Sequence, residues 1–160
     1  MVLNLAIPVV GSIMNDMKKN IILDRGVVRC PIAAASAILT DQWSVIVLRD
    51  IAFFGQRTFR DIISNNNEKI PSSTLAKRLK RLVDVGLLCF KSDETHSQRK
   101  IYCLTQAGIE LVPVIISMAA WSSKHQILDP STIEFLKPLQ EKNNPALDKF
   151  LSNLRIEHMS

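Results

Sequence analysis

The feature that most constrains this chain of 160 residues is a strongly amphipathic segment in its middle third. The segment opens at Pro71 and ends before Gly86, and its apolar residues recur at the i, i+4, i+7, i+8 spacing of one helix face. These apolar residues are Leu75, Leu79, Leu82 and Val83. Proline suits the first helical position, and glycine often lies just past a helix end. The pattern therefore predicts a helix from Pro71 to Val85 that packs with one face and exposes a polar, basic face.

A β-hairpin is expected directly after this helix. Leu87–Lys91 and Arg99–Leu104 contain the apolar and aromatic residues that strands favour, and both have the length of a strand. The polar turn Asp93–Gln98 separates them. Two strands placed immediately behind a helix indicate a fold that mixes helices with a small sheet.

Shorter elements are predicted before the amphipathic helix. Pro31 opens an alanine-rich helix, and Asp41 can cap a second, amphipathic one that Gly55 ends. A short extended piece, Arg57–Phe59, then precedes one or two helical turns at Phe59–Ile63. These elements supply the partners against which the apolar face of the later helix can pack.

The rest of the chain is predicted to be helical. Thr105 can cap a helix from Gln106 to about Lys124, which Pro113 is expected to interrupt or kink. Two weaker helices follow Asp129-Pro130 and Asn144-Pro145. The predicted order of helix, helix, short strand, helix, helix, hairpin and long helix is that of a winged helix-turn-helix domain. The fold class is therefore mainly α, of the α+β kind.

In this arrangement the second helix of the helix-turn-helix pair enters the major groove of DNA. The hydroxyl residues in its first turn are Ser72, Ser73 and Thr74. The cations that follow on its polar side are Lys77, Arg78, Lys80 and Arg81. The first turn and the first two cations are expected to reach base edges or phosphates, and the last two cations are expected to hold phosphate. For each cation taken alone, an ordinary solvated helix face is the alternative.

The hairpin is expected to contact DNA less extensively. Arg99 and Lys100 suit a wing that lies along the backbone or in the minor groove, where the negative potential favours cations. Asp93 and Glu94 would repel phosphate at the tip. We therefore expect a tip that lies away from DNA, with Arg99 reaching in.

A set of short motifs, in order and with matching gaps, resembles the HxlR-type regulators. The motifs are Cys30-Pro31-Ile32, Trp43, Leu48-Arg49-Asp50, Arg57-Thr58-Phe59, Leu75, Arg78-Leu79, Leu82, Gly86-Leu87, Arg99, Tyr102, Leu104-Thr105, Gly108, Trp121 and His125. The resemblance implies a winged-helix homodimer that binds operator DNA, with the first and last helices of the module as flanking dimerisation helices. This chain departs from the family in the wing, where Ser97-Gln98 replaces the prolines that often precede the arginine.

The resemblance also sets the expected domain limits. Residues 1–28 would be an N-terminal arm or helix, residues 29–125 the DNA-binding domain, and residues 126–160 a C-terminal helical extension. The charge is distributed in agreement with this division. From Arg49 to Lys100 there are eleven Lys/Arg and six Asp/Glu, whereas the remainder has nine of each, so the whole net charge of +5 lies in this part. A basic excess confined to one region is typical of phosphate binding.

Cys30 is a candidate switch. Several HxlR-type proteins resemble thiol sensors with a cysteine at this position, and a helix N-terminus beside Arg29 is expected to lower a thiol pKa. Oxidation or alkylation there would shift a dimerisation helix. The alternative is a small residue that only packs at the helix start. Cys89 and Cys103 are expected only to pack in the hairpin strands.

Other classes of function lack support in the sequence. No Ser/His/Asp set, carboxylate pair, metal-ligand spacing or phosphate-binding glycine motif is evident, so no enzyme, metal or cofactor is predicted. The apolar start, Val2–Ile13, is short and is broken by Pro8 and Gly11, so neither a signal peptide nor a membrane span is expected. Three widely spaced cysteines fit a reducing, cytoplasmic location.

These observations favour a sequence-specific transcriptional regulator that binds a double-stranded DNA operator as a homodimer. Its effector would act through Cys30 as an electrophile or oxidant, or would be a small molecule between the dimer helices. The alternative is a protein-interaction module that kept the winged-helix fold and lost DNA binding.

Overall fold

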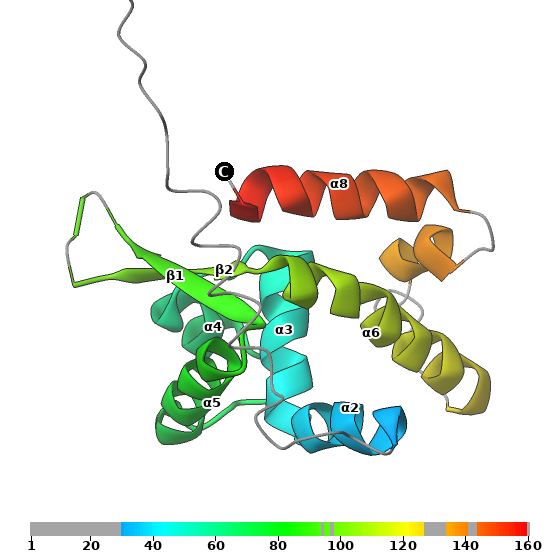
Figure 1. Ribbon diagram of the computed structural model, residues 1–160, viewed down its shortest axis with the longest axis horizontal. Helices are drawn as coiled ribbons and strands as arrows, with labels where there is room; N and C mark the ends of the chain where they lie inside the picture. The colour runs from blue at the N-terminus through cyan, green and yellow to red at the C-terminus, as the bar shows by residue number, and fades with distance from the viewer. Residues whose placement is uncertain (1–29, 94, 97, 127–133, 141–143, 160) are drawn as a thin grey trace, which may run out of the picture.

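The computed structural model describes residues 30–93, 95–96, 98–126, 134–140 and 144–159. Its elements in chain order are α2 (Pro31–Leu39), α3 (Gln42–Phe54), α4 (Phe59–Asn65), α5 (Ser72–Asp84), β1 (Leu88–Ser92), β2 (Lys100–Leu104), α6 (Gln106–His125), the 3-10 helix η1 (Glu134–Gln140) and α8 (Pro145–Met159). α3 lies at the centre, with α4, α5 and the hairpin on one side and α6 and α8 on the other (Figure 1).

The buried face of α3 forms the middle of the core. Val47, Leu48 and Ile51 on α3 are at most 1% exposed, and the helices and strands around them add their own apolar faces. Those faces contribute Ile62, Leu75, Leu79, Leu82, Leu88, Leu104, Ile109 and Val112. The predicted core face of the amphipathic helix is confirmed for its three leucines, which are at most 1% exposed.

The predicted ends of α3 are confirmed. The side chain of Asp41 accepts a hydrogen bond from the backbone N–H of Trp43 at 3.2 Å, which satisfies one orphan donor of the first turn. Gly55 closes the helix with φ of 62°, a left-handed conformation that favours glycine. α3 is therefore fixed in length, and its partners pack against a defined surface.

A buried polar network attaches the turn between α4 and α5 to α3. The amide of Asn66 donates to Asp50 of α3 at 2.9 Å, and its oxygen accepts from the backbone N–H of Ile70 at 3.0 Å. Lys69 within this turn has φ of 55°, a conformation that is uncommon for residues other than glycine. One side chain thus determines where α5 begins relative to α3.

Arg49 supplies the positive charge that balances the carboxylates of this network, Asp50 and Glu68. Its guanidinium donates to Asp50 at 2.6 Å and to Glu68 at 2.5 and 2.8 Å. Burial opposes the charge of Arg49, but these hydrogen bonds outweigh it and raise the pKa above its ordinary value. The hydrogen bond from Arg49 also lowers the pKa of Glu68. The turn is therefore held by groups that stay ionised at neutral pH.

The hairpin pairs antiparallel, with Leu88 opposite Leu104 at its base and Ser92 opposite Lys100 towards its tip. A close junction joins this base to α6. The Thr105 hydroxyl donates to the Gly86 carbonyl at 2.6 Å and accepts from the Gly108 N–H at 3.2 Å, which confirms the predicted cap. At Gly108, a Cβ would lie 2.3 Å from the Leu87 carbonyl oxygen, so only glycine fits.

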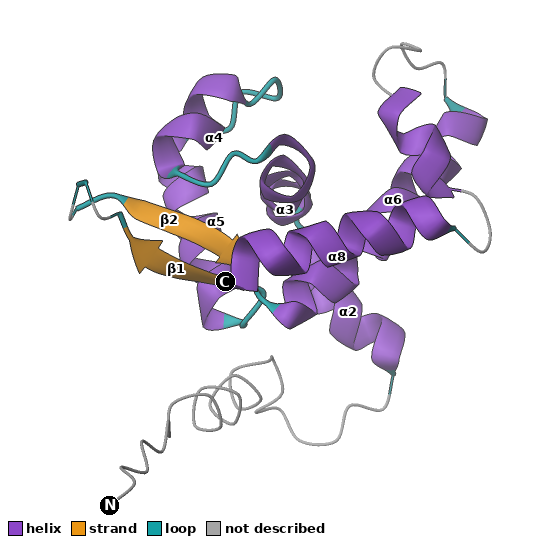
Figure 2. Ribbon diagram, turned by 90° about the horizontal axis from the view of Figure 1, so that it is seen from above, coloured by secondary structure: helices purple, strands orange, loops and turns teal. Residues whose placement is uncertain are grey.

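The C-terminal helix α8 packs on α6, η1 and the outer edge of β2 (Figure 2). His158 is buried, and its Nδ1 accepts from the backbone N–H of Leu104 at 3.2 Å. Burial lowers the pKa of His158, and the nearby positive charge of Arg57 lowers it further. Arg57 also forms an ion pair with Glu157 at 3.4 Å. The C-terminal extension is therefore joined to a strand of the wing.

Several predicted limits differ from the structure. Pro71 caps α5 from outside and Ser72 is its first residue, because Pro71 has the extended backbone (ψ 141°) of an N-cap. β2 begins at Lys100 because Arg99 still belongs to the turn. α6 continues through Pro113, so the predicted interruption is wrong. The first of the two weak helices is a 3-10 helix, Glu134–Gln140, and the second is a full helix of 15 residues.

The division at residues 28 and 125 stays a prediction, and the arm at residues 1–28 lies outside the described residues. In the described part of the chain, no individual helix has the length and apolar character needed to cross a membrane, and one sharply bent pair, Pro31–Leu39 with Gln42–Phe54, meets those criteria by length and composition alone.

Asn66→Ala tests the network. The change leaves the Ile70 N–H and an oxygen of Asp50 without their buried partner, so we expect a loss of about 1–3 kcal/mol in the free energy of unfolding. Urea denaturation followed by circular dichroism measures it. Asn67→Ala, at an exposed neighbour, is the control and should change stability by less than about 0.5 kcal/mol. Equal losses in the two variants would contradict this role for Asn66.

Candidate nucleic-acid interface

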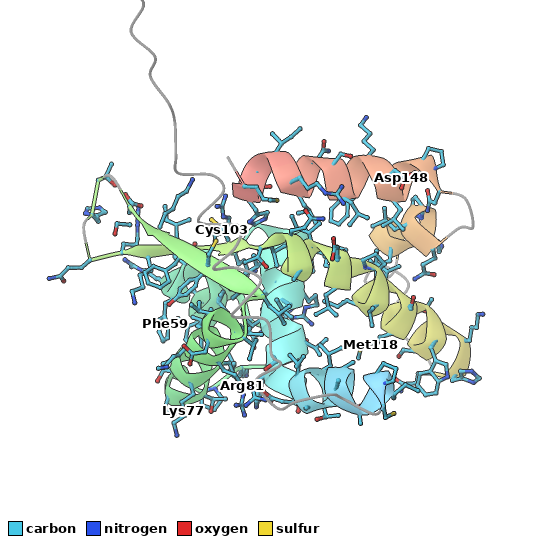
Figure 3. All side chains as sticks on the ribbon, viewed as in Figure 1. Phe59, Lys77, Arg81, Cys103, Met118 and Asp148 are labelled. Atoms are coloured by element: carbon cyan, nitrogen blue, oxygen red, sulfur yellow. The ribbon has the colours of Figure 1, made fainter. Side chains whose placement is uncertain are left out.

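The outward face of α5 carries small polar residues in its first turn and a lysine in its second. Ser72 and Ser73 are exposed, and Thr74 is half-buried beside them. Lys77 is exposed and points away from the body of the molecule (Figure 3). Among the residues that the structure describes, Lys77 has no ion-pair or hydrogen-bond partner, so its ammonium group is available to an anion.

The other three cations of α5 already have partners within the chain. Arg78 forms an ion pair with Asp41, the residue that caps α3. Lys80 pairs with Asp84 one turn later at 2.6 Å, an exposed contact of small energetic value. Arg81 is directed towards α2 (Figure 3) and donates to the carbonyl of Ala37 at 2.7 Å. Two of these side chains therefore also fix α5 against α2 and α3.

Asp93 organises the wing turn, which differs from the expected acidic tip. It is buried, and its carboxylate accepts from the backbone N–H of Thr95 at 2.8 Å, from the Thr95 hydroxyl at 2.6 Å and from Arg99 Nε at 2.7 Å. The bond from Thr95 and that from Arg99 hold its pKa well below the ordinary range. Asp93 thus neutralises Arg99 and does not project its charge, while Glu94 lies outside the described residues.

Arg99 and Lys100 lie together at the wing. The Arg99 side chain remains 47% exposed although it is paired with Asp93. The Lys100 ammonium lies 4.2 Å from the centre of the Phe90 ring, a cation–π contact across the two strands. Both cations therefore keep a solvent-facing side.

A shallow hollow of about 260 Å³ joins the wing to the start of α4. Its lining residues are Thr58, Phe59, Arg60, Gln98, Arg99, Lys100 and Tyr102. Arg60 is exposed here and adds a third cation to the two of the wing. Arg60 was not among the predicted contact residues, because long-range pairing of Arg57 and Thr58 with β2 brings the start of α4 against the wing.

Cys30 lies at the start of α2 and is not among the residues of this basic surface. It is the N-cap of α2, it is exposed, and its carbonyl accepts from the Ala34 N–H at 3.1 Å. Its side chain makes no capping hydrogen bond. Arg29, which was expected to influence its thiol, lies outside the described residues.

Comparison with known protein families identifies this arrangement. Residues 38–129, more than half of the chain, match the family model described as HxlR-like helix-turn-helix. The chain belongs to this family. The matched residues run from the end of α2 through the whole of α6, so they include the helix-turn-helix, the wing and the helix behind it.

Curated relatives from bacteria agree with the family. Proteins named uncharacterized HTH-type transcriptional regulator in Mycobacterium bovis and Mycobacterium tuberculosis are each 33% identical over 94 residues, which are 59% of this chain and 58% of theirs. One with the same description in Synechocystis is 33% identical over 92 residues, which are 56% of this chain and 64% of that protein. The chain thus spans less than two thirds of the length of these relatives.

Two solved structures share the fold. PA1607, described as a candidate transcription factor, superposes with a TM-score of 0.57 at 28% identity, over 63% of this chain and 68% of that one. The redox regulator HypR in its oxidized form gives a TM-score of 0.53 at 20% identity, over 62% of this chain and all of that one. The fold of this chain is accordingly a winged helix.

Proposed function

We propose that this protein is a transcriptional regulator that binds operator DNA as a homodimer. The observation that carries the proposal is the outward face of α5, where exposed Ser72 and Ser73 precede Lys77, which has no partner among the described residues. Its leucine face holds this helix in the core. The membership in the HxlR-like helix-turn-helix family and the names of the curated relatives support it.

The first turn of α5 would approach base edges in the major groove. Hydroxyls bond either bases or phosphates, and lysine can bind guanine O6 and N7. We assign Ser72, Ser73, Thr74 and Lys77 to this part of the contact. The remaining predicted residues, Arg78, Lys80, Arg81, Arg99 and Lys100, would bind phosphates, each while keeping or exchanging its present partner. Arg99 suits this role because its side chain is half exposed while it is paired with Asp93.

Lys77→Ala tests the DNA contact. Loss of a base contact costs about 1–3 kcal/mol of discrimination, whereas loss of a phosphate contact alone lowers the salt slope by about one unit. Fluorescence anisotropy on fragments selected from a genomic library measures both quantities. The matched control is Lys149→Ala, an exposed cation on α8, which should change neither.

Two outcomes would contradict the proposal. One is wild-type binding without fragment preference or salt dependence, and the other is equal affinity in Lys77→Ala and wild type. Either result favours the alternative of an interaction module that kept the fold and lost DNA binding.

The dimer would form through α2 and the exposed apolar residues of α6 from Val114 onwards. Ile32 of α2 is 76% exposed, and Val114, Met118 and Trp121 of α6 are 43–62% exposed. α2 has no buried residue of its own, although it is almost wholly apolar. A second copy is the occupant that the family resemblance implies for these two helices, and it would cover them both. Two α5 helices would then reach successive major grooves, about 10 base pairs apart.

Trp121→Glu should convert the dimer to a monomer, because a carboxylate would be buried in an apolar interface. Sedimentation velocity at several protein concentrations measures the state. Ile156→Glu is the matched control, since Ile156 is 72% exposed but lies on α8. A Trp121→Glu protein that sediments as wild type does would exclude this dimer surface.

Cys30 would act as the switch from the N-cap of α2. Modification of an exposed thiol at the start of a dimerisation helix would change how α2 packs across the dimer. We expect diamide or an aldehyde to change DNA affinity in the wild type and not in Cys30→Ser. A Cys30→Ser protein that still responds to both reagents would rule out the thiol switch and leave a small ligand between the dimer helices.

A further inference from the structure

The wing contains a second thiol site, formed by Cys89 of β1 and Cys103 of β2. The strand register places these residues directly opposite each other. Thr105 N–H bonds the Leu87 carbonyl at 3.1 Å and Asp93 N–H bonds the Arg99 carbonyl at 2.9 Å. Opposed residues along an antiparallel pair alternate between hydrogen-bonded and non-hydrogen-bonded pairs. Since Leu87–Thr105 and Asp93–Arg99 are hydrogen-bonded pairs, Cys89–Cys103 is one too, and the typical Cα separation of such a pair is about 5.5 Å. A disulfide spans Cα atoms about 4.4–6.8 Å apart.

Both thiols lie on the same face of the hairpin, because opposed residues of an antiparallel pair share a face. Cys89 Sγ lies 3.7 Å from the carbonyl oxygen of Cys103 and donates to it. Cys103 Sγ in turn donates to the carbonyl oxygen of Ile101 at 3.8 Å. The backbone spacing thus suits a disulfide, and both sulfurs would have to give up their present hydrogen bonds to form it.

The two thiols differ in access and in charge environment. Cys89 is exposed, whereas Cys103 is 3% exposed beneath the C-terminal end of α8. Arg57 Nη2 donates to Cys103 Sγ at 2.7 Å, and the same guanidinium reaches the Tyr102 carbonyl. A reagent therefore meets Cys89 first, and a thiolate at Cys103 would have a cation beside it.

We propose that Cys89 and Cys103 form a dithiol site that small disulfides of the glutathione class oxidise to a cross-strand disulfide. The Cys89 thiolate attacks one sulfur of the small disulfide, which forms a mixed disulfide and expels one small thiolate. The Cys103 thiolate, beside Arg57, then attacks Cys89 Sγ and expels the second. The protein dithiol loses two electrons and two protons, and the small disulfide becomes two thiols.

This site is separate from Cys30 and does not depend on the proposed DNA binding. Burial raises the pKa of the Cys89 thiol, and the adjacent Cys103 raises it further, so exchange should accelerate as the pH rises and Cys89 ionises. The bond would also take Cys103 away from Arg57, which links β2 to Glu157 of α8. Oxidation would thus act on the contact between the wing and the C-terminal helix.

The test uses Cys30→Ser, in which only the wing thiols remain, incubated with oxidised glutathione. Trypsin cuts between the cysteines at Lys91, Arg99 and Lys100, so a disulfide joins two separate peptides. We expect a linked Cys89–Cys103 peptide, and a chain mass lower by two hydrogens, that a reductant reverses. In Cys30→Ser/Cys103→Ser the reaction should stop at glutathionyl-Cys89. In Cys30→Ser/Cys89→Ser the buried Cys103 should stay unmodified, with a native circular dichroism spectrum.

Three results would overturn the proposal. The first is a Cys30→Ser protein in which glutathionyl-Cys89 accumulates and is not converted to the linked peptide. The second is the absence of any reaction at Cys89 as the pH is raised until free thiol reagents titrate Cys89 fully. The third is a linked peptide that, in a mixture of isotope-labelled and unlabelled protein, joins two different chains.

Discussion

The hydrogen bond between Asp50 and Asn66 is the contact on which the rest of the structure depends. It places a carboxylate that is 2% exposed next to the core, where an unpaired charge would cost several kcal/mol. The guanidinium of Arg49, which is partly exposed, compensates the charge of Asp50. The side-chain oxygen of Asn66 accepts a hydrogen bond from the backbone N–H of Ile70. The direction of α5, and hence of Ser73 and Lys77, follows from this chain of contacts.

A second set of contacts joins the wing to the C-terminal extension. Arg57 lies where the segment between α3 and α4 meets the outer edge of β2, and it reaches Tyr102, Cys103 and Glu157. His158 of α8 adds a further contact with β2, because its Nδ1 accepts a hydrogen bond from the backbone N–H of Leu104. The extension is therefore part of the winged-helix body, and a change in the wing strands can reach α8 through one guanidinium.

Local signals in the sequence predicted most of the fold. Leu75, Leu79 and Leu82 identified the buried face of α5, and Asp41 and Thr105 identified two helix starts, because apolar spacing and capping depend on neighbours along the chain. The predicted interruption at Pro113 was wrong because α6 continues through it and forgoes one backbone N–H. The limits of α5 and β2 moved by one residue, which is within the ordinary fraying of element ends.

The candidate site was less predictable, because its charges are arranged by tertiary contacts. Arg78, Arg81 and Arg99 read as free cations in sequence, yet each has a partner that lies elsewhere in the chain: Asp41, Ala37 and Asp93. The opposition of Cys89 and Cys103 depends on hairpin register, which the strand pattern alone left open. The residue types indicated a basic surface. The structure was needed to distinguish the cations that hold α5 and the wing in place from those that are free to contact an anion.

The most direct test of this account is dimethyl sulfate protection of guanine N7 on a DNA fragment selected by the wild-type protein. We expect protection in two major-groove half-sites about one helical turn apart, with the protection lost in Lys77→Ala and retained in Lys149→Ala. Protection in a single half-site, or full protection that persists in Lys77→Ala, would contradict it.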